Sequence, residues 1–452
     1  MPLPEDPRAT AAASVPASRK KRVLSGMRPT GRLHIGHYFG ALRNWVKLQN
    51  DPQYECFFFI ADWHALTSDY ADTSGTAQNA IEITTDYLAS GLDPQKSTIF
   101  LQSLVPEHAE LYLLLSMVTP LSWLERVPTY KEALENVKGK DLRTYGFLGY
   151  PVLQTSDIVM YGEPSQELLV PVGEDQKSHV ELSREIVRRF NVFYGFETKD
   201  ELFQSHNEAA LRRIVARVSS LSDDAHEEFA PVFRQSFKNF SDEIGFVNFQ
   251  KKMGDDARFF SYAERLREPE VMLTETPRIP GTDGRKMSKS YNNFILLSES
   301  DDSIDAKTKA MVTDPARKRR TDPGNPDVCP VYDWHKLFSP PDILTWSAQG
   351  CRTAAIGCIE CKKAMSDNLI RWIAPIRERR RDYEKNPGRV LELLDEGSKR
   401  AQNVSRETMS RVREAVFGWQ KKRTEVAGPA SESSTPRAEG LKGPGARPRV
   451  RT

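Results

Sequence analysis

The sequence lacks any apolar run that approaches the ~18 residues of a membrane-spanning helix. Its alanine-rich start also lacks the apolar segment that a secretory signal peptide requires. We therefore expect a cytoplasmic protein without a membrane partner. An excess of one charge is missing as well, because 64 Lys and Arg residues stand against 62 Asp and Glu residues, for a formal net charge of +2. This balance neither indicates nor excludes RNA binding, which local basic runs are able to support.

Cysteine is scarce, yet four of the five cysteines are clustered with the spacing C-x21-C-x6-C-x2-C. Disulfides seldom persist in a reducing compartment, so the cluster indicates metal ligands, with unrelated buried cysteines as the alternative. Four thiolates suit either tetrahedral Zn²⁺ or a [4Fe-4S] cluster, and the spacing does not separate the two. The candidate ligands are Cys329, Cys351, Cys358 and Cys361. We interpret the fifth, Cys56, as a small buried hydrophobe.

The two ends of the chain and its last third differ in pattern from the rest. Residues 1–22 and 427–452 are rich in Pro, charge, and either Ala or Gly, so we expect disordered tails. The arginines of the second tail either are simply solvated or touch RNA. Residues 301–426 carry apolar side chains at three- and four-residue spacing, which predicts a helical C-terminal domain.

Short apolar runs alternate with helical patterns in the first two thirds of the chain. The runs that start at Val23, Cys56 and Ser97 are typical of buried strands, and the helices between them predict a parallel sheet with helical crossovers. The expected fold class is α/β, a Rossmann-type doubly wound parallel sheet over residues 23–300. Within it we expect a helical insertion at about 200–270. A stripe of phenylalanines in this insertion predicts packing rather than a binding surface: Phe229, Phe233, Phe237 and Phe240.

A turn rich in glycine and proline follows the first expected strand and leads into His34-Ile35-Gly36-His37. A helix that begins here would place its amide groups and two imidazoles at the carboxyl end of the sheet, where the helix dipole favours a phosphate chain. Gly36 leaves room for a flat base against the backbone. The alternative is that the histidines only cap a helix and the glycines only make a turn.

A second loop, Gly284 to Ser290, contains two lysines separated by two residues. Lys286 and Lys289 are suited to placing two positive charges on a pyrophosphate, although a lone lysine pair more often lies on a solvated surface. Taken together, His34-Ile35-Gly36-His37 and Lys286-Met287-Ser288-Lys289-Ser290 resemble the two signature sequences of class I aminoacyl-tRNA synthetases, in the same order.

Four further segments make the chain similar to tryptophanyl-tRNA synthetases of the bacterial type. The resemblance extends from about Val23 to about Lys422, apart from one insertion. It implies a ligase that activates L-tryptophan with ATP and transfers it to the 3' end of tRNA(Trp). It also implies a homodimer and an anticodon-binding role for the helical domain, with no DNA partner. The segments are Ala61 to Leu66, Leu124 to Arg126, Tyr150 to Asp157 and Pro171 to Gln176.

The indole N–H of a bound tryptophan requires an acceptor, because an unpaired buried donor costs ~1–3 kcal/mol. The resemblance implies that Asp157 is this acceptor, that Tyr150 and Gln176 hold the ammonium group, and that His64 lies close by. It implies a catalytic role in stabilising phosphate charge for His34, His37, Lys286 and Lys289, with Mg²⁺ accompanying ATP. The ATP contacts that it implies are Arg28, Pro29, Thr30, Gly36, His37, Gly173, Glu174, Asp175, Ile279, Lys286, Met287, Ser288, Lys289 and Ser290.

Two departures from the family pattern leave alternatives open. Gln154 stands where some members have a methionine against the indole, and tyrosine-specific relatives show a similar Leu-Gln-x-x-Asp string, so a tyrosyl-tRNA synthetase is one alternative. A non-catalytic synthetase-like regulator is another, although it would have lost site residues that are present here.

The resemblance favours [4Fe-4S] over Zn²⁺ on the cysteines, whose first gap differs by about one residue from the family form. The basic runs 317–320 and 377–381 form either a solvated helix face or a contact with the tRNA backbone.

Overall fold

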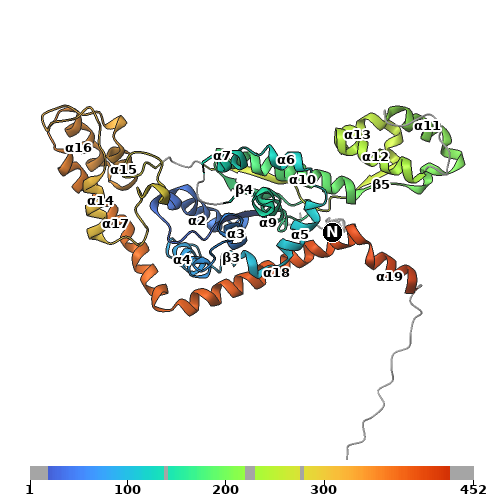
Figure 1. Cartoon of the computed structure of the whole chain (residues 1–452), viewed down its shortest axis with the longest axis horizontal. Helices are drawn as coiled ribbons and strands as arrows, with labels where there is room; N and C mark the ends of the chain where they lie inside the picture. The colour runs from blue at the N-terminus through green and yellow to red at the C-terminus, as the bar shows by residue number, and fades with distance from the viewer. Residues whose placement is uncertain (1–18, 137–140, 219–229, 275–278, 428–452) are drawn as a thin grey trace, which may run out of the picture.

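The computed structural model describes residues 19–136, 141–218, 230–274 and 279–427 (Figure 1). Its centre is a five-stranded sheet in the order β3-β2-β1-β4-β7, and every neighbouring pair is parallel. The strand order therefore reverses between β1 and β4. This confirms the doubly wound α/β fold class. The strands are β1 (Lys21–Met27), β2 (Tyr54–Ile60), β3 (Ser97–Leu101), β4 (Leu168–Val172) and β7 (Pro269–Leu273).

Successive residues of each strand point into two different hydrophobic cores. On β2, Cys56 and Phe58 belong to the first core, whereas Phe57 and Phe59 belong to the second. Helices cover both faces of the sheet, which is why these strands appear in the sequence as unbroken apolar runs and not as alternating ones. Cys56 is 2% exposed and confirms the expectation of a buried hydrophobe.

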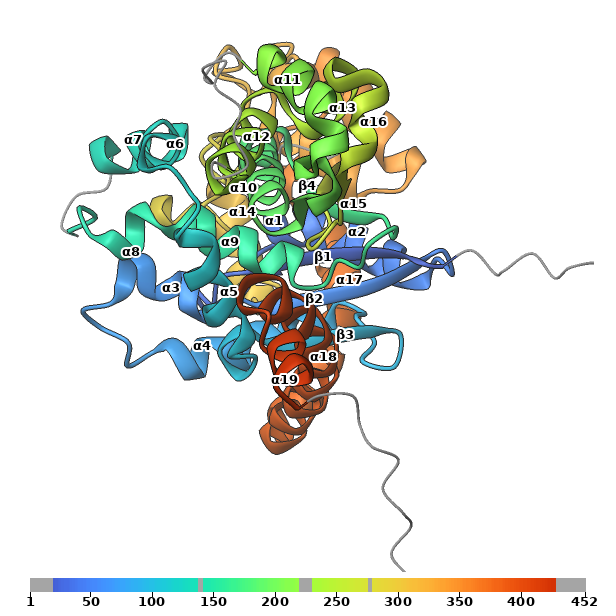
Figure 2. The same cartoon turned by 90° about the vertical axis from the view of Figure 1, so that its right-hand side faces the viewer.

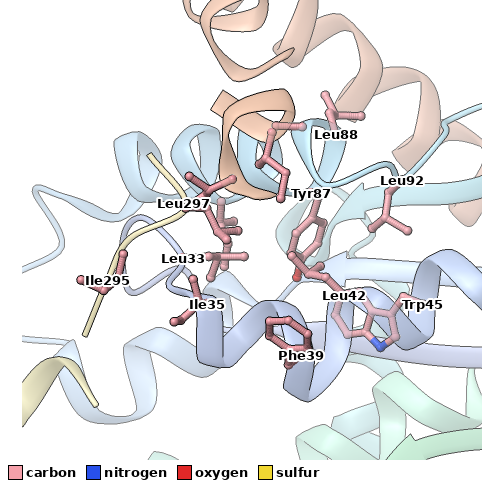
Figure 3. Packing of buried hydrophobic residues seen from close by; sticks show 14 of the residues in the cluster. Leu33, Ile35, Phe39, Leu42, Trp45, Tyr87, Leu88, Leu92, Ile295 and Leu297 are labelled. Atoms are coloured by element: carbon pink, nitrogen blue, oxygen red, sulfur yellow. The ribbon is translucent and has the colours of Figure 1, made fainter. Parts of the chain in front are cut away.

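The first core encloses the helix that starts in the histidine signature. α1 (Ile35–His37) continues through a π-helical turn, η1 (Tyr38–Leu42), into α2 (Arg43–Asn50). These helices pack against α4 (Thr76–Ala89). Figure 3 shows Leu33, Ile35 and Phe39 gathered with Tyr87 and Leu297 in this core. The signature residues thus stand on a rigid support.

The second core lies on the opposite face of the sheet. Here α5 (Glu107–Ser116) packs against α9 (Tyr150–Val159), and α9 packs against α10 (Lys177–Gly195). Shorter helices lead to and from these elements. They are α3 (Asp62–Asp69), α6 (Leu121–Glu125), α7 (Pro128–Asn136), α8 (Tyr145–Leu148), and the 3-10 turns η2 (Gln102–Leu104) and η3 (Glu174–Gln176).

The last third of the described chain is helical, as the spacing predicts, but it shares the cores of the sheet. Trp334 and Leu369 lie in the same core as Val23 of β1, and Met409 lies in the second core. In Figure 1 the long α18 runs beneath the sheet and contacts β3. The helices are α14 (Asp301–Ala310), α15 (Pro330–Phe338), α16 (Pro341–Arg352), α17 (Cys358–Lys385), α18 (Pro387–Phe417) and α19 (Trp419–Ala427), with the 3-10 turns η8 (Lys289–Tyr291) and η9 (Pro326–Val328).

The insertion forms a small unit at one end of the molecule, far from α15 and α16 (Figure 1). In Figure 2 this end faces the viewer. It has a hydrophobic core of its own, in which Phe233, Phe237 and Phe240 are buried. This confirms the packing role of the stripe, whereas Phe229 lies outside the described residues. Its elements are the antiparallel pair β5 (Phe196–Thr198) and β6 (Phe260–Tyr262), the helices α11 (Glu208–Arg217), α12 (Ala230–Ile244) and α13 (Phe246–Met253), and the 3-10 turns η4 (Asp200–Phe203), η5 (Ser205–Asn207) and η7 (Gly254–Phe259).

The expected first tail is too long at its C-terminal end. Lys21 and Arg22 belong to β1, and Arg22 is 7% exposed. Its guanidinium donates to the Tyr161 carbonyl and to the carboxylates of Glu55 and Glu163, each at 2.9 Å. These partners lie far away in the sequence, so the local basic composition misled the prediction.

None of the helices in the described ranges combines the length and apolarity needed to cross a membrane.

A glycine sets how closely α18 approaches the sheet. A Cβ atom at Gly397 would lie 1.7 Å from the Ile99 carbonyl oxygen of β3. We expect Gly397→Ala to lower the free energy of unfolding by about 1–3 kcal/mol, since the helix must shift. Urea unfolding followed by circular dichroism measures this change. Gly388→Ala in the first turn of α18 is the matched control, because its Cβ would meet only Asn386 at 3.5 Å. Equal midpoints for the two variants would contradict this packing.

Candidate active site

A cavity of about 880 Å³ opens at the carboxyl ends of β1 and β4. Met27 and Arg28 line it from the end of β1, and Val172 and Gly173 line it from the end of β4. This is the point at which the strand order reverses, where the crossover helices diverge and leave a crevice at the edge of a parallel sheet. The strand order of the sheet therefore explains why a cavity lies at this place.

The bottom of the cavity is formed by Asp157 on α9, which is 1% exposed. Its carboxylate accepts hydrogen bonds from Gln102 at 2.8 and 2.9 Å, from His64 Nε2 at 2.7 Å and from His108 Nδ1 at 2.5 Å. Burial raises the pKa of Asp157, but the bonds from His108 and His64 outweigh burial and hold this pKa below its usual value. Asp157 is thus an ionised acceptor inside an apolar pocket.

The partners of Asp157 differ in their access to the cavity. His64 lines the cavity together with Asp157, whereas Gln102 and His108 are fully buried behind the carboxylate. His108 Nε2 also lies 2.7 Å from the Tyr161 hydroxyl, which is able to donate to it when Nδ1 carries the ring proton. The buried partners fix the carboxylate from behind, so its cavity side is left to His64 or to a ligand.

A second cluster of polar side chains lines another part of the same cavity. Tyr150 and Gln176 both contact His179: the Tyr150 hydroxyl lies 2.9 Å from Nε2, and Gln176 Oε1 lies 2.8 Å from Nδ1. Thr129 Oγ1 is 2.8 Å from the same Nε2. All four residues line the cavity. Their oxygen atoms offer acceptors for a cationic group.

The two histidines of the signature stack at the entrance of the first helix. Their ring centroids are 3.7 Å apart, and His37 Nδ1 accepts the His34 backbone N–H at 3.2 Å. Burial, and then the charge of Lys289, lower the pKa of His34 to about 4. Burial, His34 and Lys289 also lower the pKa of His37 well below its usual value. Both imidazoles are therefore neutral near pH 7, and within the described chain the buried His34 Nδ1 has no hydrogen-bond partner.

The lysine loop meets the histidine signature in space. Lys289 Nζ donates to the Thr30 carbonyl at 2.8 Å, and a Cβ added to Gly36 would come within 3.4 Å of Met287 Sδ. Ser290 of the same loop lines the cavity that contains Asp157. The structure thus brings the two signatures into contact with each other. Of their residues, only Ser290 lines the cavity; His34, His37, Lys286 and Lys289 do not line it.

The remaining implied ATP contacts fall into different environments. Ile279 and Met287 are buried in the first core, each 6% exposed, so they anchor the lysine loop to that core. The side chain of Asp175 lies outside the described part of the chain. Pro29 is buried, Ser288 is half-buried and caps η8, and the exposed members are Arg28, Thr30, Glu174, Lys286 and Ser290.

The four clustered cysteines come from three neighbouring helices. Cys329 precedes α15, Cys351 lies in the last turn of α16, and Cys358 and Cys361 lie in the first turn or so of α17. Burial raises the pKa of Cys361 to about 12, and the charges of the three other cysteines contribute in the same direction. In the part of the chain that the structure describes, however, no group of three or more His, Cys, Asp or Glu side chains is arranged to hold a metal ion.

The basic runs expected either to be solvated or to contact tRNA are in part neither. Arg317 is 9% exposed and donates to the carbonyls of Arg320 and Ile356. Arg377 bonds the Glu299 carbonyl, and Arg380 is 1% exposed. These side chains serve contacts inside the protein. The members of the runs that face solvent are Lys318, Arg319, Arg320, Arg379 and Arg381.

Four residues of this site were not predicted from the sequence. Gln102 directly follows β3, at the same carboxyl edge of the sheet as the two signatures, and this position after an apolar strand was the available signal. His108 lies six residues further, on α5. Thr129 and His179 join the site only through the packing of α7 and α10 around α9, for which the sequence offers no local signal.

Comparison with known proteins identifies the class to which this fold and cavity belong. The sequence profile of the family described as "tRNA synthetases class I (W and Y)" matches residues 17–210 and 249–373. The chain belongs to this family and is therefore an aminoacyl-tRNA synthetase. The interruption of the match, 211–248, contains most of α11 and all of α12, and thus coincides with part of the insertion.

Similar proteins within the family include bacterial tryptophan–tRNA ligases. The one from Ralstonia nicotianae is 48% identical over 88% of this chain and 98% of the relative, and that from Thermotoga maritima is 44% identical over 87% and 98%. Among solved structures, a tryptophanyl-tRNA synthetase from Campylobacter jejuni in complex with ADP and tryptophan has a TM-score of 0.65 and 28% identity, covering 87% of this chain and 99% of that one.

Proposed function

We propose that this chain activates L-tryptophan with ATP and transfers it to tRNA(Trp). The observation that carries the choice of tryptophan is Asp157, an ionised carboxylate at the bottom of a largely apolar cavity. A carboxylate only accepts hydrogen bonds, and a charge-assisted bond to an indole N–H is stronger than a neutral one. Tyrosine also presents a donor at the end of its ring, and the high identity to tryptophan–tRNA ligases favours tryptophan over it.

The proposed substrate contacts follow from the two polar ends of the cavity. The indole N–H replaces the bond from His64 to Asp157, since His64 is the partner that faces the cavity. The ammonium group of the substrate binds the oxygens of Tyr150 and Gln176. ATP lies between the two signatures, and its ribose faces the backbone of Gly173 to Asp175. Mg²⁺ is held mainly by the phosphates, as is usual for this ion.

In the first step, an oxygen of the tryptophan carboxylate attacks the α-phosphorus of ATP. A new phosphorus–oxygen bond forms as the bond to pyrophosphate breaks, giving tryptophanyl-adenylate. The protein supplies position and charge: Lys286 and Lys289 offset the negative charge on the leaving pyrophosphate. His34 and His37 contribute as neutral hydrogen-bond donors, because their pKa values are low. In the second step, a ribose hydroxyl at the tRNA 3' end attacks the adenylate carbonyl and AMP leaves.

Pyrophosphate exchange tests both the reaction and the amino acid. We expect tryptophan, and not tyrosine, to drive exchange of labelled pyrophosphate into ATP. Asp157→Asn should raise the KM for tryptophan by about ten- to a hundredfold, because a hydrogen bond to a charged group contributes ~1.5–3 kcal/mol. Asp395→Asn, an exposed carboxylate on α18, is the control that should leave KM unchanged. Exchange driven by tyrosine would contradict the proposed substrate, and an unchanged KM in Asp157→Asn would contradict the role of that residue.

We also propose that Cys329, Cys351, Cys358 and Cys361 hold a [4Fe-4S] cluster, with Zn²⁺ as the alternative. Cys329 and Cys358 stand at the N-terminal ends of α15 and α17, where the helix dipole favours thiolates. Arg317 Nη1 lies 3.8 Å from Cys351 Sγ and adds positive charge beside the donor set. Such a centre would join three helices that already contact one another. All five cysteines are unpaired, in keeping with the cytoplasmic location that we propose.

The cluster proposal predicts a coloured protein. Purified without oxygen, the chain should show a broad absorbance near ~400 nm with about four iron and four sulfide per chain. Cys358→Ser should abolish this absorbance, whereas Cys56→Ser, in β2, should retain it. Zinc in stoichiometric amount without iron would support the alternative. A chain that carries neither metal would refute a metal centre.

The described surface favours a homodimer, which we propose forms through α5 and α6. Leu113, Met117 and Leu121 are 53%, 69% and 58% exposed and are spaced four residues apart. They are the support for this proposal, because exposed apolar side chains that form a contiguous patch mark an interaction surface. The helical region, with the exposed Lys318, Arg319 and Arg381, is proposed to contact the tRNA anticodon arm.

The dimer surface is open to a charge-insertion test. Met117→Glu should shift the sedimentation coefficient from that of a dimer to that of a monomer, since a buried unpaired carboxylate opposes association. Leu391→Glu on α18 is the control, because Leu391 is an exposed apolar residue, 47% exposed, on a different face. A dimer that persists in Met117→Glu would place the interface elsewhere.

A further inference from the structure

A buried carboxylate on α4 holds the turn that precedes the histidine signature. Asp86 is 0% exposed, and its Oδ2 accepts the backbone N–H of Leu33 at 2.6 Å. Leu33 is the residue directly before His34. The start of the signature helix is therefore fixed by a side chain from a separate element and not only by its own backbone bonds.

The second oxygen of Asp86 binds an arginine from the helical region. Arg380 of α17 is 1% exposed and donates from Nη1 to Asp86 Oδ1. The same guanidinium donates to Glu82, and through Nε to Glu384 at 3.0 Å. The Arg380 fork is thus shared among three carboxylates, two of them on α4.

The network also reaches the signature turn from its other side. Arg32, which precedes Leu33, donates from Nε to Glu82 at 2.9 Å. Its Nη2 lies 3.7 Å from Glu384 Oε1. Two consecutive residues of the turn are therefore tied to α4 and α17, one through its side chain and one through its backbone. A cavity lined by Arg32, Arg380 and Glu384 lies at this junction.

Stability alone does not explain this arrangement. Removing two opposite charges from water costs free energy that their attraction often fails to offset, so apolar side chains of the same volume would stabilise the fold as well or better. Burial raises the pKa of Asp86 to about 6, against the opposing effects of Arg380 and the Leu33 N–H. The Asp86 charge in turn favours the protonated form of Lys289, whose pKa burial lowers. Asp86 thus contacts the turn before the first signature and raises the pKa of a lysine in the second.

We infer that Asp86 and Arg380 are positioning residues for the ATP site: they hold the Leu33–His34 turn where the imidazoles meet the nucleotide. This inference rests on the proposed function, in which His34 contacts ATP. It assigns α17 two tasks, since the same helix begins with Cys358 and Cys361 and anchors the signature turn near its other end. The helical region thereby takes part in the geometry of the first chemical step, without touching a substrate.

The test compares adenylate formation, tryptophan binding and unfolding in the full-length protein. We expect Arg380→Gln to slow single-turnover adenylate formation by about ten- to a hundredfold, because displacement of a catalytic group by about 1 Å has effects of this size. The KM for tryptophan should stay within about twofold, since Asp157 belongs to a different network. Asp86→Asn retains an oxygen for the Leu33 N–H, so it should slow adenylate formation less than Arg380→Gln does. Arg371→Gln, exposed on the same helix α17, is the matched control and should match the parent.

A double variant separates positioning from stability. Asp86→Leu with Arg380→Leu removes both buried charges together, so it avoids the uncompensated charge that can unfold either single variant. We expect the double variant to lose less thermal stability than either single leucine variant does. The slow rate should persist, because the Leu33 N–H has lost its acceptor. A parental rate in the double variant, or in a folded Arg380→Gln, would overturn the inference. Failure of the parent itself to exchange pyrophosphate with tryptophan would instead refute the proposed function.

Discussion

Keeping Asp157 ionised beneath an apolar cavity is the constraint on which much of this structure depends. A bare buried carboxylate would take up a proton or destabilise the fold, so it must be surrounded by donors. Those donors come from the segments that follow β2 and β3, and from α5, while Asp157 itself lies on α9. Only a sheet that brings its carboxyl ends to one edge places these segments around one atom. The parallel topology is therefore a requirement of the pocket as well as a consequence of the apolar strands.

The nucleotide end of the cleft solves the opposite electrostatic problem. ATP brings several negative charges, yet the two imidazoles nearest the site are neutral because they are buried beside Lys289. Positive charge is instead concentrated on the lysine loop, which enters the cleft from about 250 residues further along the chain. The histidine turn is held by Asp86 and Arg380, so its position is set by packing and ion pairing and not by the charge of the ligand. The proposed ATP site would therefore be formed before the nucleotide binds.

The helical region and the insertion differ in their relation to this centre. Helices α14 to α18 contribute side chains to the cores on both faces of the sheet, so displacing them would disturb the catalytic fold. The insertion instead buries its phenylalanines in a core of its own, and the family profile is interrupted within it. Its size and sequence are thus freer to change without effect on the cavity. This contrast follows from which apolar surfaces are shared and which are not.

The sequence by itself determined the three strands that start near Val23, Cys56 and Ser97, the packing stripe of the insertion and the two signatures, because these features depend on local composition and spacing. Gly36 and the lysine pair were enough, as sequence features, to predict a nucleotide site. Only the tertiary structure placed Gln102 and His108 behind Asp157, drew Arg22 out of the expected tail, and turned Arg380 from a presumed surface charge into a buried partner of Asp86. Each of these depends on contacts between residues more than thirty positions apart, and the folded packing, not the local pattern, decides where a charged side chain finds its partner.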